Sequence, residues 1–290
     1  MADNLPLADP PYFALPDHAV AGLEGPDAIA FAQAQFGNDV SLLEDGSWQW
    51  NCWLTPKGRV IAVFALARIS PEHLLAVLPD ASAAAFAQAL TRFVFRRKLR
   101  IGTRTDLTVA GAFAAPAQAR GNRFADHAGE LEFDLGSPAS PRRWRLVPRA
   151  DAAPNEDGAQ VLRWQAADLH FGLPRLQEPQ REQWTPQQLS LERLPAFSIK
   201  KGCYPGQEIV ARTHFLGKAK RGLALFAADA APQAGARVSL GGDPVGEVVS
   251  VAAGTPATVL AVMPLDAPLQ IAHAGTTTLK PLALQDGLSR

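Results

Sequence analysis

The sequence predicts an α+β fold followed by a C-terminal antiparallel β-barrel. Before Gly222, helix-like and strand-like segments mix without the regular strand–helix alternation of a parallel sheet. No GxGxxG motif follows a predicted strand there, so a dinucleotide-binding fold is not expected. From Gly222 onward, short apolar runs recur between Gly, Pro and Asp residues, which is typical of a small barrel.

The composition is that of a globular protein with a sizeable core. Hydrophobic residues make up 47% of the chain, charged residues 19%, and the formal net charge at pH 7 is zero. This balance argues against a protein that coats nucleic acid, so we expect any contact with RNA to be local. No apolar run reaches the roughly 18 residues that span a bilayer, and the polar start lacks the regions of a signal peptide. We therefore expect a cytoplasmic monomer without membrane contact.

The first helix is predicted over residues 25–37. Pro26 would lie in its first turn, its apolar residues would share one face, and Gly37 would cap its C-terminal end. A tryptophan-rich strand and a long apolar strand follow. Because alternate residues of a strand face opposite sides, Trp48 and Trp50 are predicted to lie on one face and Trp53 on the other. Such aromatic walls suit a flat heterocycle.

Residues 73–78 are predicted to form another strand, and Asp80 is predicted to cap the helix after it. The end of that helix is basic. Its cationic residues are Arg92, Arg96, Arg97, Lys98 and Arg100. Cations complement a helix C-terminus, which explains much of this segment, and a phosphate-contacting surface is the alternative.

Further strands are predicted between residues 107 and 147. A helix is then predicted over residues 163–171, ended by Gly172 and Pro174. Trp164 on this helix is as compatible with a core position as with a binding pocket.

The greatest concentration of reactive and charged residues lies in residues 197–221. A strand over residues 197–199 is predicted to enter a turn bracketed by Gly202 and Gly206, because glycine permits positive φ and close backbone approach. A helix over residues 207–212 is predicted to follow, with an acidic residue in its first turn.

Cys203 lies just ahead of this predicted helix and beside Lys200 and Lys201. A helix N-terminus and neighbouring cations both stabilise a thiolate, so Cys203 is a candidate reactive residue. The alternative is a small buried side chain, the commoner role of a lone cysteine. From Lys200 to Arg221 there are six Lys or Arg residues and one acid, a balance that also suits an anionic ligand.

This segment resembles a long motif of a known family. Lys201-Gly202-Cys203-Tyr204-x-Gly206-Gln207-Glu208, followed by Val210-Ala211-Arg212, is similar to the signature of the YgfZ-type folate-binding proteins. These proteins are relatives of the glycine-cleavage T-protein, an aminomethyltransferase. The resemblance implies a T-protein-like arrangement of two interleaved α+β subdomains around a central cavity in residues 1–217, with the β-barrel in residues 218–290.

The resemblance also implies a site. Cys203 would be the catalytic residue, and tetrahydrofolate or a derivative would be the cofactor. The residues expected to bind it are Asn38, Asp39, Trp164, Lys201, Gly202, Tyr204, Gly206, Gln207, Glu208 and Arg212. A second aromatic residue of the family's pocket falls near His18 here, so the pterin clamp departs from the family pattern. Because the chain has two cysteines, too few for a four-thiolate site, no metal site is expected.

Three functions follow from the resemblance. The preferred one is a folate-binding accessory protein for the assembly or repair of iron–sulfur enzymes, including a tRNA-modifying radical methylthiotransferase. Its partners would be reduced folate and iron–sulfur client enzymes or cluster-assembly proteins, and any contact with tRNA would be indirect or weak. The first alternative is a tetrahydrofolate-dependent aminomethyl or methyl transferase, which is disfavoured because Ala62-Val63-Phe64 replaces the T-protein's Asp pair. The second alternative is a folate-binding module without chemistry. An intact Cys203 distinguishes the other two functions from this module.

Overall fold

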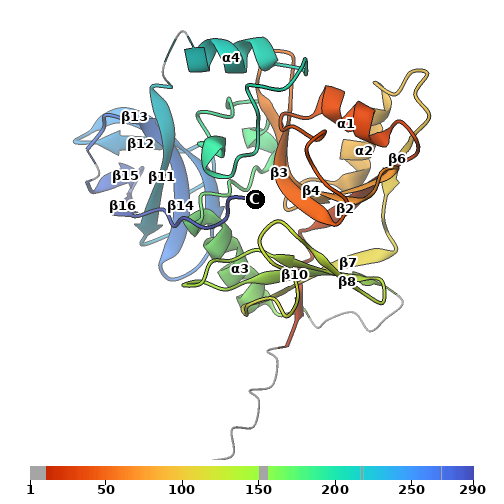
Figure 1. Ribbon diagram of the computed structural model, residues 1–290. Helices are drawn as coiled ribbons and strands as arrows, with labels where there is room; N and C mark the ends of the chain where they lie inside the picture. The colour runs from red at the N-terminus through yellow and green to blue at the C-terminus, as the bar shows by residue number, and fades with distance from the viewer. Residues whose placement is uncertain (1–10, 150–155, 216, 218, 269) are drawn as a thin grey trace, which may run out of the picture.

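Two open sheets and a closed barrel make up the protein, as described by a computed structural model for residues 11–149, 156–215, 217, 219–268 and 270–290. Figure 1 shows these three bodies around the C-terminal end of the chain, with the barrel on the left and one open sheet on the right. Helices α1 (Ala28–Gln35) and α2 (Ala83–Thr91) cover the outer face of that sheet. The predicted α+β class with a C-terminal barrel is confirmed.

The first open sheet has the order β3-β4-β5-β2-β6, and its neighbouring strands are antiparallel. Its strands are β2 (Ala19–Glu24), β3 (Ser47–Leu54), β4 (Val60–Ser70), β5 (His73–Leu78) and β6 (Arg100–Thr103). The predicted facing of the tryptophans is confirmed. Trp48 and Trp50 belong to the core shared with the second sheet, whereas Trp53 packs against Phe86 of α2.

The second open sheet has the order β1-β7-β10-β9-β8. Its strands are β1 (Phe13–Ala14), β7 (Leu107–Ala112), β8 (Ala125–His127), β9 (Glu130–Asp134) and β10 (Arg143–Pro148). Because β1 precedes the strands of the first sheet and β7 follows them, the two α+β bodies interleave along the chain, as predicted.

The barrel closes in the order β11-β14-β13-β12-β15-β16. Its strands are β11 (Arg221–Ala228), β12 (Arg237–Leu240), β13 (Asp243–Ala252), β14 (Ala257–Pro264), β15 (Ala272–Ala274) and β16 (Thr277–Leu282). The apolar run over residues 269–272 is one of the short strands that the sequence pattern predicts after Gly222. This prediction is wrong, since β15 begins at Ala272, and Leu269 lies outside the described residues. The last strand, β16, was not predicted because its Thr, Lys and Pro residues interrupt the apolar pattern. The division of the chain at residues 217 and 218 stays a prediction.

Helix α3 (Gly158–His170) lies between the barrel and the second sheet, where it contacts β13, β14 and β1 (Figure 1). Helix α4 (Gln207–Phe215) and two short 3₁₀ helices, Glu178–Gln180 and Leu191–Arg193, belong to the segment that joins α3 to the barrel. Within the described ranges, no helix is both long and apolar enough to cross a membrane.

The predicted ends of α1 are wrong. The helix begins at Ala28, so Pro26 precedes the N-cap residue, Asp27. It ends at Gln35 with Phe36 extended, so Gly37 does not cap it. Gly37 is needed for packing instead, because a Cβ atom there would lie 2.7 Å from the Sγ atom of Cys52.

The predicted cap of α2 is also wrong. Ser82 is the N-cap, and its hydroxyl accepts a hydrogen bond from the backbone N–H of Ala85 at 3.3 Å. Asp80 faces the interior and accepts a hydrogen bond from Arg175 Nε at 2.8 Å. The Asp80 carboxylate, which the local sequence pattern predicts as a helix cap, therefore pairs with a residue far along the chain.

Candidate functional site

The turn around Cys203 is present, but only one of its two glycines is conformationally required. Gly206 has a φ of +80°, and a Cβ atom there would lie 2.7 Å from the Cα atom of Gly58. The turn therefore packs against the hairpin turn between β3 and β4. Gly202 is exposed and has open space around its Cα atom, so its predicted conformational role is wrong.

The strand predicted over residues 197–199 is also wrong. These residues are irregular, and the Ser198 N–H donates to the Gly37 carbonyl at 2.9 Å. This bond joins the segment to the loop after α1. In a strand, the backbone groups of residues 197–199 would instead pair with those of a neighbouring strand.

Lys201 fastens the Cys203 turn to the loop after α1. Its ammonium group is buried and donates to the carbonyls of Gln33 at 2.6 Å, Phe36 at 2.6 Å and Asn38 at 2.9 Å. An ammonium group has three N–H donors, so this set uses all of them. Burial lowers the pKa of Lys201 to about 8, although the nearby charge of Asp39 opposes the shift. The prediction that Lys201 favours a thiolate at Cys203 stays a prediction.

Other residues of the motif also form the framework of the turn. The buried Tyr204 donates its hydroxyl to the Ser198 carbonyl at 3.1 Å, and Gln207 Nε2 donates to the Lys201 carbonyl at 3.1 Å. Asn38 Nδ2 donates to the carbonyls of Trp50 at 2.9 Å and of Pro195 at 2.6 Å. Most of the motif therefore makes internal contacts that fix the turn.

Asp39, Glu208 and Arg212 lie toward the surface of the same region. Burial alone would raise the pKa of Asp39, but hydrogen bonds from Ser41 and Gln33 and the charge of Lys201 lower it, so its carboxylate is ionised at neutral pH. Glu208 is exposed in the first turn of α4, and Arg212 is exposed in its last turn. Asp39 is linked to the Cys203 turn through the charge of Lys201, and Glu208 and Arg212 lie on the helix that follows this turn.

The two cysteines differ sharply in accessibility. Both are free thiols, but Cys203 is exposed and Cys52 is fully buried on β3. Burial raises the pKa of Cys52 to about 12, against the opposing charge of Lys201. Because a thiolate is the reactive form, Cys203 is the cysteine available for chemistry with an external partner.

Replacing Lys201 with methionine is expected to lower the free energy of unfolding by about 2–4 kcal/mol, because buried carbonyl oxygens lose their donors. Chemical denaturation followed by tryptophan fluorescence measures this change. The matched control is Lys200→Met, which removes the neighbouring exposed ammonium and should change stability by less than about 0.5 kcal/mol. Equal effects of the two substitutions would show that the three carbonyl contacts do not hold the turn.

Trp164 makes its contacts with residues outside the Cys203 turn. It is fully buried on α3, and the Arg142 guanidinium stacks over its ring at 4.6 Å from the centroid. The rings of Phe13 and Phe113 lie 6.0 and 5.5 Å from it. Trp164 is thus a core residue of the junction between α3 and the second sheet. Among the ring contacts and hydrogen bonds of the described residues, none joins Trp164 to the Cys203 turn.

A chain of buried ion pairs runs beside Trp164. Arg142 donates to Asp168 at 2.7 Å, and Asp168 also accepts from Arg175 at 2.8 Å. Arg175 continues the chain to Asp17, which accepts from His18 Nδ1 at 2.7 Å. Burial alone would raise the pKa of Asp17, but hydrogen bonding and charge from His18, together with the charge of Arg175, lower it.

Several polar atoms around this chain have no hydrogen-bond partner among the described residues. This unpartnered cluster comprises Trp144 Nε1, Trp164 Nε1, His18 Nε2, and Nε and Nη2 of Arg142. The members form two pairs, since the His18 ring lies 5.4 Å from that of Trp144 and Arg142 stacks on Trp164, and the chain of ion pairs links Arg142 to His18. A buried polar atom without a partner is costly, so the cluster is suited to pair with the polar atoms of a ligand.

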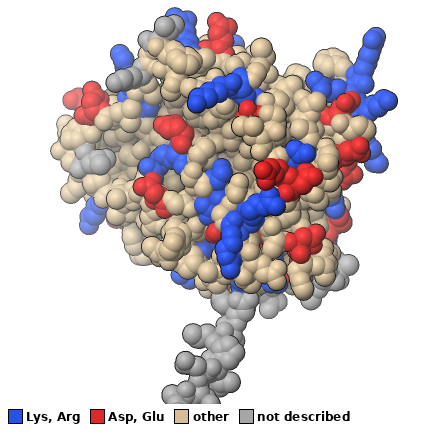
Figure 2. Space-filling model, in the orientation of Figure 1, with Lys and Arg blue, Asp and Glu red and all other residues tan. Residues whose placement is uncertain are grey.

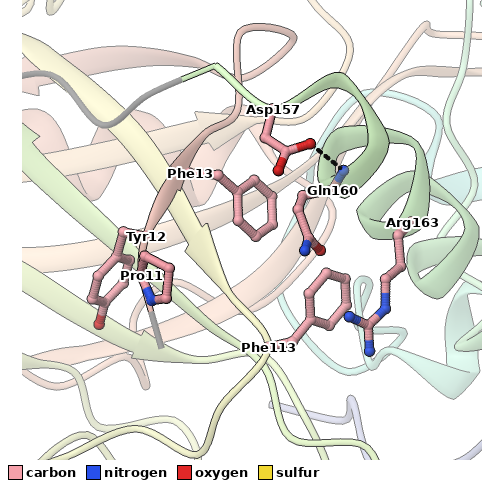
Figure 3. Close-up of a pocket in the computed structure, with 7 residues that line it drawn as sticks. All are labelled: Pro11, Tyr12, Phe13, Phe113, Asp157, Gln160 and Arg163. Carbon is pink, nitrogen blue, oxygen red and sulfur yellow. Dashed lines mark hydrogen bonds between the residues drawn. The ribbon is translucent and has the colours of Figure 1, made fainter. Parts of the chain in front are cut away.

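An open cavity lies beside Phe13 and Phe113, two rings that pack against Trp164. It has a volume of about 340 Å³ and is lined by Pro11, Tyr12, Phe13, Phe113, Asp157, Gln160 and Arg163 (Figure 3). The Arg163 guanidinium lies 3.9 Å from the centroid of Phe113. Phe13 and Phe113 line this cavity and also pack against Trp164, which belongs to the unpartnered cluster.

Sequence reasoning identified Trp164 and His18 but missed Arg142, Trp144 and Asp168. A usable signal existed for Asp168, because it lies one helical turn after Trp164 and therefore shares its face of α3. Arg142 and Trp144 gave a weaker signal, a charged and an aromatic residue beside an apolar strand, which indicates no particular partner.

No family model matches the chain. A protein of Vibrio vulnificus named tRNA-modifying protein YgfZ is 30% identical over 243 residues, which cover 76% of this chain and 74% of the relative. The protein of the same name from Cronobacter sakazakii is 27% identical over 237 residues, covering 76% and 71%.

Among solved structures, glycine cleavage system aminomethyltransferase T from Bartonella henselae superposes with a TM-score of 0.72. The match covers 95% of this chain and 85% of that chain at 14% sequence identity, so it shows a shared fold alone. The Vibrio relative is similar enough, over enough of both chains, to show common descent: the chain belongs to the YgfZ family.

Proposed function

We propose that this protein binds a reduced folate beside Trp164 and uses Cys203 to support iron–sulfur enzymes, including one that modifies tRNA. The unpartnered cluster carries the folate part of this proposal, because it combines aromatic rings with buried polar atoms that lack partners. Support also comes from the fold shared with an aminomethyltransferase and from relatives named for tRNA modification. The protein is proposed to act as a cytoplasmic monomer.

The residues present suit a folate. The pterin ring of a reduced folate accepts hydrogen bonds at its carbonyl oxygen and at its one ring nitrogen that carries no hydrogen. The indole N–H groups of Trp144 and Trp164 and the guanidinium of Arg142 are donors of the required kind. In the adjoining cavity, Arg163 supplies a cation for the carboxylates of the glutamate tail, and Phe113 supplies an aromatic wall.

Cys203 is proposed to be the reactive group at the surface. A single thiolate cannot hold an iron–sulfur cluster, so direct participation requires further ligands from a client enzyme or a cluster-assembly protein. The exposure of Cys203 makes such a shared site accessible to another protein. This exposure also favours the accessory role over a folate-binding module without chemistry.

Aminomethyl transfer is not the proposed activity. Ala62, Val63 and Phe64 occupy buried positions of β4, so no carboxylate is presented where the T-protein carries its Asp pair. Incubation with the glycine-cleavage carrier protein and tetrahydrofolate is therefore expected to yield no methylenetetrahydrofolate, and turnover in this assay would restore the transferase alternative.

Tetrahydrofolate is expected to bind saturably in a calorimetric titration, and Trp164→Phe is expected to weaken binding about tenfold or more. The substitution removes one indole N–H donor and part of a ring face, and a tenfold change corresponds to about 1.4 kcal/mol. Trp184→Phe is the matched control, because Trp184 is also buried but donates to Gln180 Oε1 at 2.8 Å. Absence of saturable binding by the unmodified protein, or equal weakening in the control, would contradict the proposed folate site.

A further inference from the structure

The segment that runs from the end of α2 to the first residue of β6 concentrates positive charge and contains no acid. This basic loop, residues 92–100, carries five Lys or Arg residues in a chain whose formal net charge is zero. Its cations, all of them exposed, are Arg92, Arg96, Arg97, Lys98 and Arg100. Within the described part of the chain, none of their side chains makes an ion pair, so their charges are free to meet an external anion. Figure 2 shows Lys and Arg side chains projecting from the corner where Figure 1 places this loop.

Phe95 lies in the middle of the basic loop and is not part of the core. Its side chain is 87% exposed, and its φ of 49° falls in the left-handed region that non-glycine residues avoid. The nearby Phe93 packs instead against Trp53, with 6.4 Å between their ring centroids. An exposed aromatic side chain held in an unfavourable backbone conformation points to a contact outside the fold.

The loop is held in this shape by the turn before α1. The Asp27 carboxylate accepts a hydrogen bond from the Lys98 N–H at 2.6 Å, and the Asp27 N–H donates to the Lys98 carbonyl at 3.3 Å. The approach is so close that a Cβ atom at Gly25 would lie 2.4 Å from the Lys98 oxygen. The cations and Phe95 therefore form a preorganised surface, which lowers the entropic cost of binding.

We propose that the basic loop binds an unpaired segment of RNA, with a base stacked on Phe95 and the phosphates on either side contacted by arginines. This inference rests on the tRNA part of the proposed function and assigns it a surface. Base stacking on an exposed aromatic ring beside cations is the usual chemistry of single-strand binding. Four of the five cations are arginines, whose planar guanidinium groups suit phosphate better than lysine does. A lone aromatic side chain offers little apolar area to a lipid bilayer, so RNA is favoured over a membrane.

Fluorescence anisotropy with a labelled tRNA, a short single-stranded RNA and its duplex tests this surface. The single strand is expected to bind more tightly than the duplex, because only unpaired bases can stack on Phe95. Phe95→Ala is expected to weaken binding roughly tenfold without changing its salt dependence, and Phe95→Trp to preserve it. Arg96→Gln with Arg97→Gln is expected to lower the slope of log affinity against log salt by about 1.4.

The matched control is Arg237→Gln with Lys280→Gln, which removes two exposed cations from the barrel and should leave binding unchanged. If tRNA binds the protein but the loop variants bind it as well as the control does, the surface assignment is wrong while the tRNA part of the proposed function stands. If the unmodified protein binds no RNA, both are wrong, whereas folate binding is tested separately. Binding of the loop to anionic vesicles in place of RNA would also overturn the inference.

Discussion

Replacing Arg175 with methionine is expected to lower the free energy of unfolding by about 3–5 kcal/mol, because three carboxylates lose their shared buried cation. Arg175 Nε and Nη1 each donate at 2.8 Å, to Asp80 and Asp168, and Nη2 pairs with Asp17. Burial alone would lower the pKa of Arg175, but these three charges raise it, so the guanidinium stays charged.

The position of Arg175 explains why this effect should extend across the molecule. Its side chain joins the segment before β2, the segment after β5 and helix α3, while its backbone exchanges hydrogen bonds of 3.0 Å with Ser250 of the barrel strand β13. We therefore expect the variant to lose the coupling between the three bodies, which denaturation monitored separately by fluorescence and circular dichroism would show as non-coincident transitions.

The control is Arg104→Met, which breaks a two-pronged ion pair with Asp106 at 2.6–2.8 Å on the surface. Because Asp106 is exposed, this pair should contribute less than about 1 kcal/mol. Adding Asp80→Asn to the Arg175→Met variant should recover part of the loss, because the cation that pairs with Asp80 is Arg175, whereas Asp168 keeps Arg142 as a partner. No recovery, together with equal effects of the two arginine substitutions, would show that the buried network does not hold the bodies together.

Local patterns explain which parts of the fold could be predicted. The facing of Trp48, Trp50 and Trp53 follows from strand alternation, and most barrel strands follow from short apolar runs between turn residues. The helix after Cys203 was predicted in the same way. In each case the decisive information lies within about ten residues along the chain.

Long-range partners explain what could not be predicted. The bond between Arg175 and Asp17 spans 158 positions, and no local rule assigns a partner at that separation. Asp80 was predicted to cap a helix because only nearby residues were considered. Its hydrogen-bond partner, Arg175, is 95 positions away. The role of Gly37 likewise depends on the Sγ atom of Cys52, on a strand that the helix pattern does not include.

The site was predicted unevenly for the same physical reason. The motif located the turn and its exposed thiol, but the structure uses Lys201 and Tyr204 for internal hydrogen bonds. The unpartnered cluster assembles residues from β10, α3 and the segment before β2, so only the folded chain brings them together.

Replacing Cys203 with serine is expected to abolish support of the iron–sulfur client enzyme in cells while leaving folding and tetrahydrofolate binding near normal. Serine keeps the size of the side chain but cannot supply a thiolate, the form of cysteine that acts as a nucleophile and as a soft metal ligand. Because Cys203 is exposed and makes no hydrogen bond within the described structure, its replacement should not disturb the turn.

The measurement is the client's activity, or the level of its modified tRNA product, in cells whose own copy of this protein has been deleted. Cys52→Ala is the matched control, since Cys52 is buried and its raised pKa keeps it a thiol at neutral pH. This control should keep client support, despite some loss of stability from the small cavity it creates. Alkylation of the folded protein should label Cys203 and spare Cys52, which would confirm which thiol is accessible. Full client support by the Cys203→Ser variant would show that the thiol has no essential chemistry, and unfolding of that variant would show that Cys203 is a packing residue.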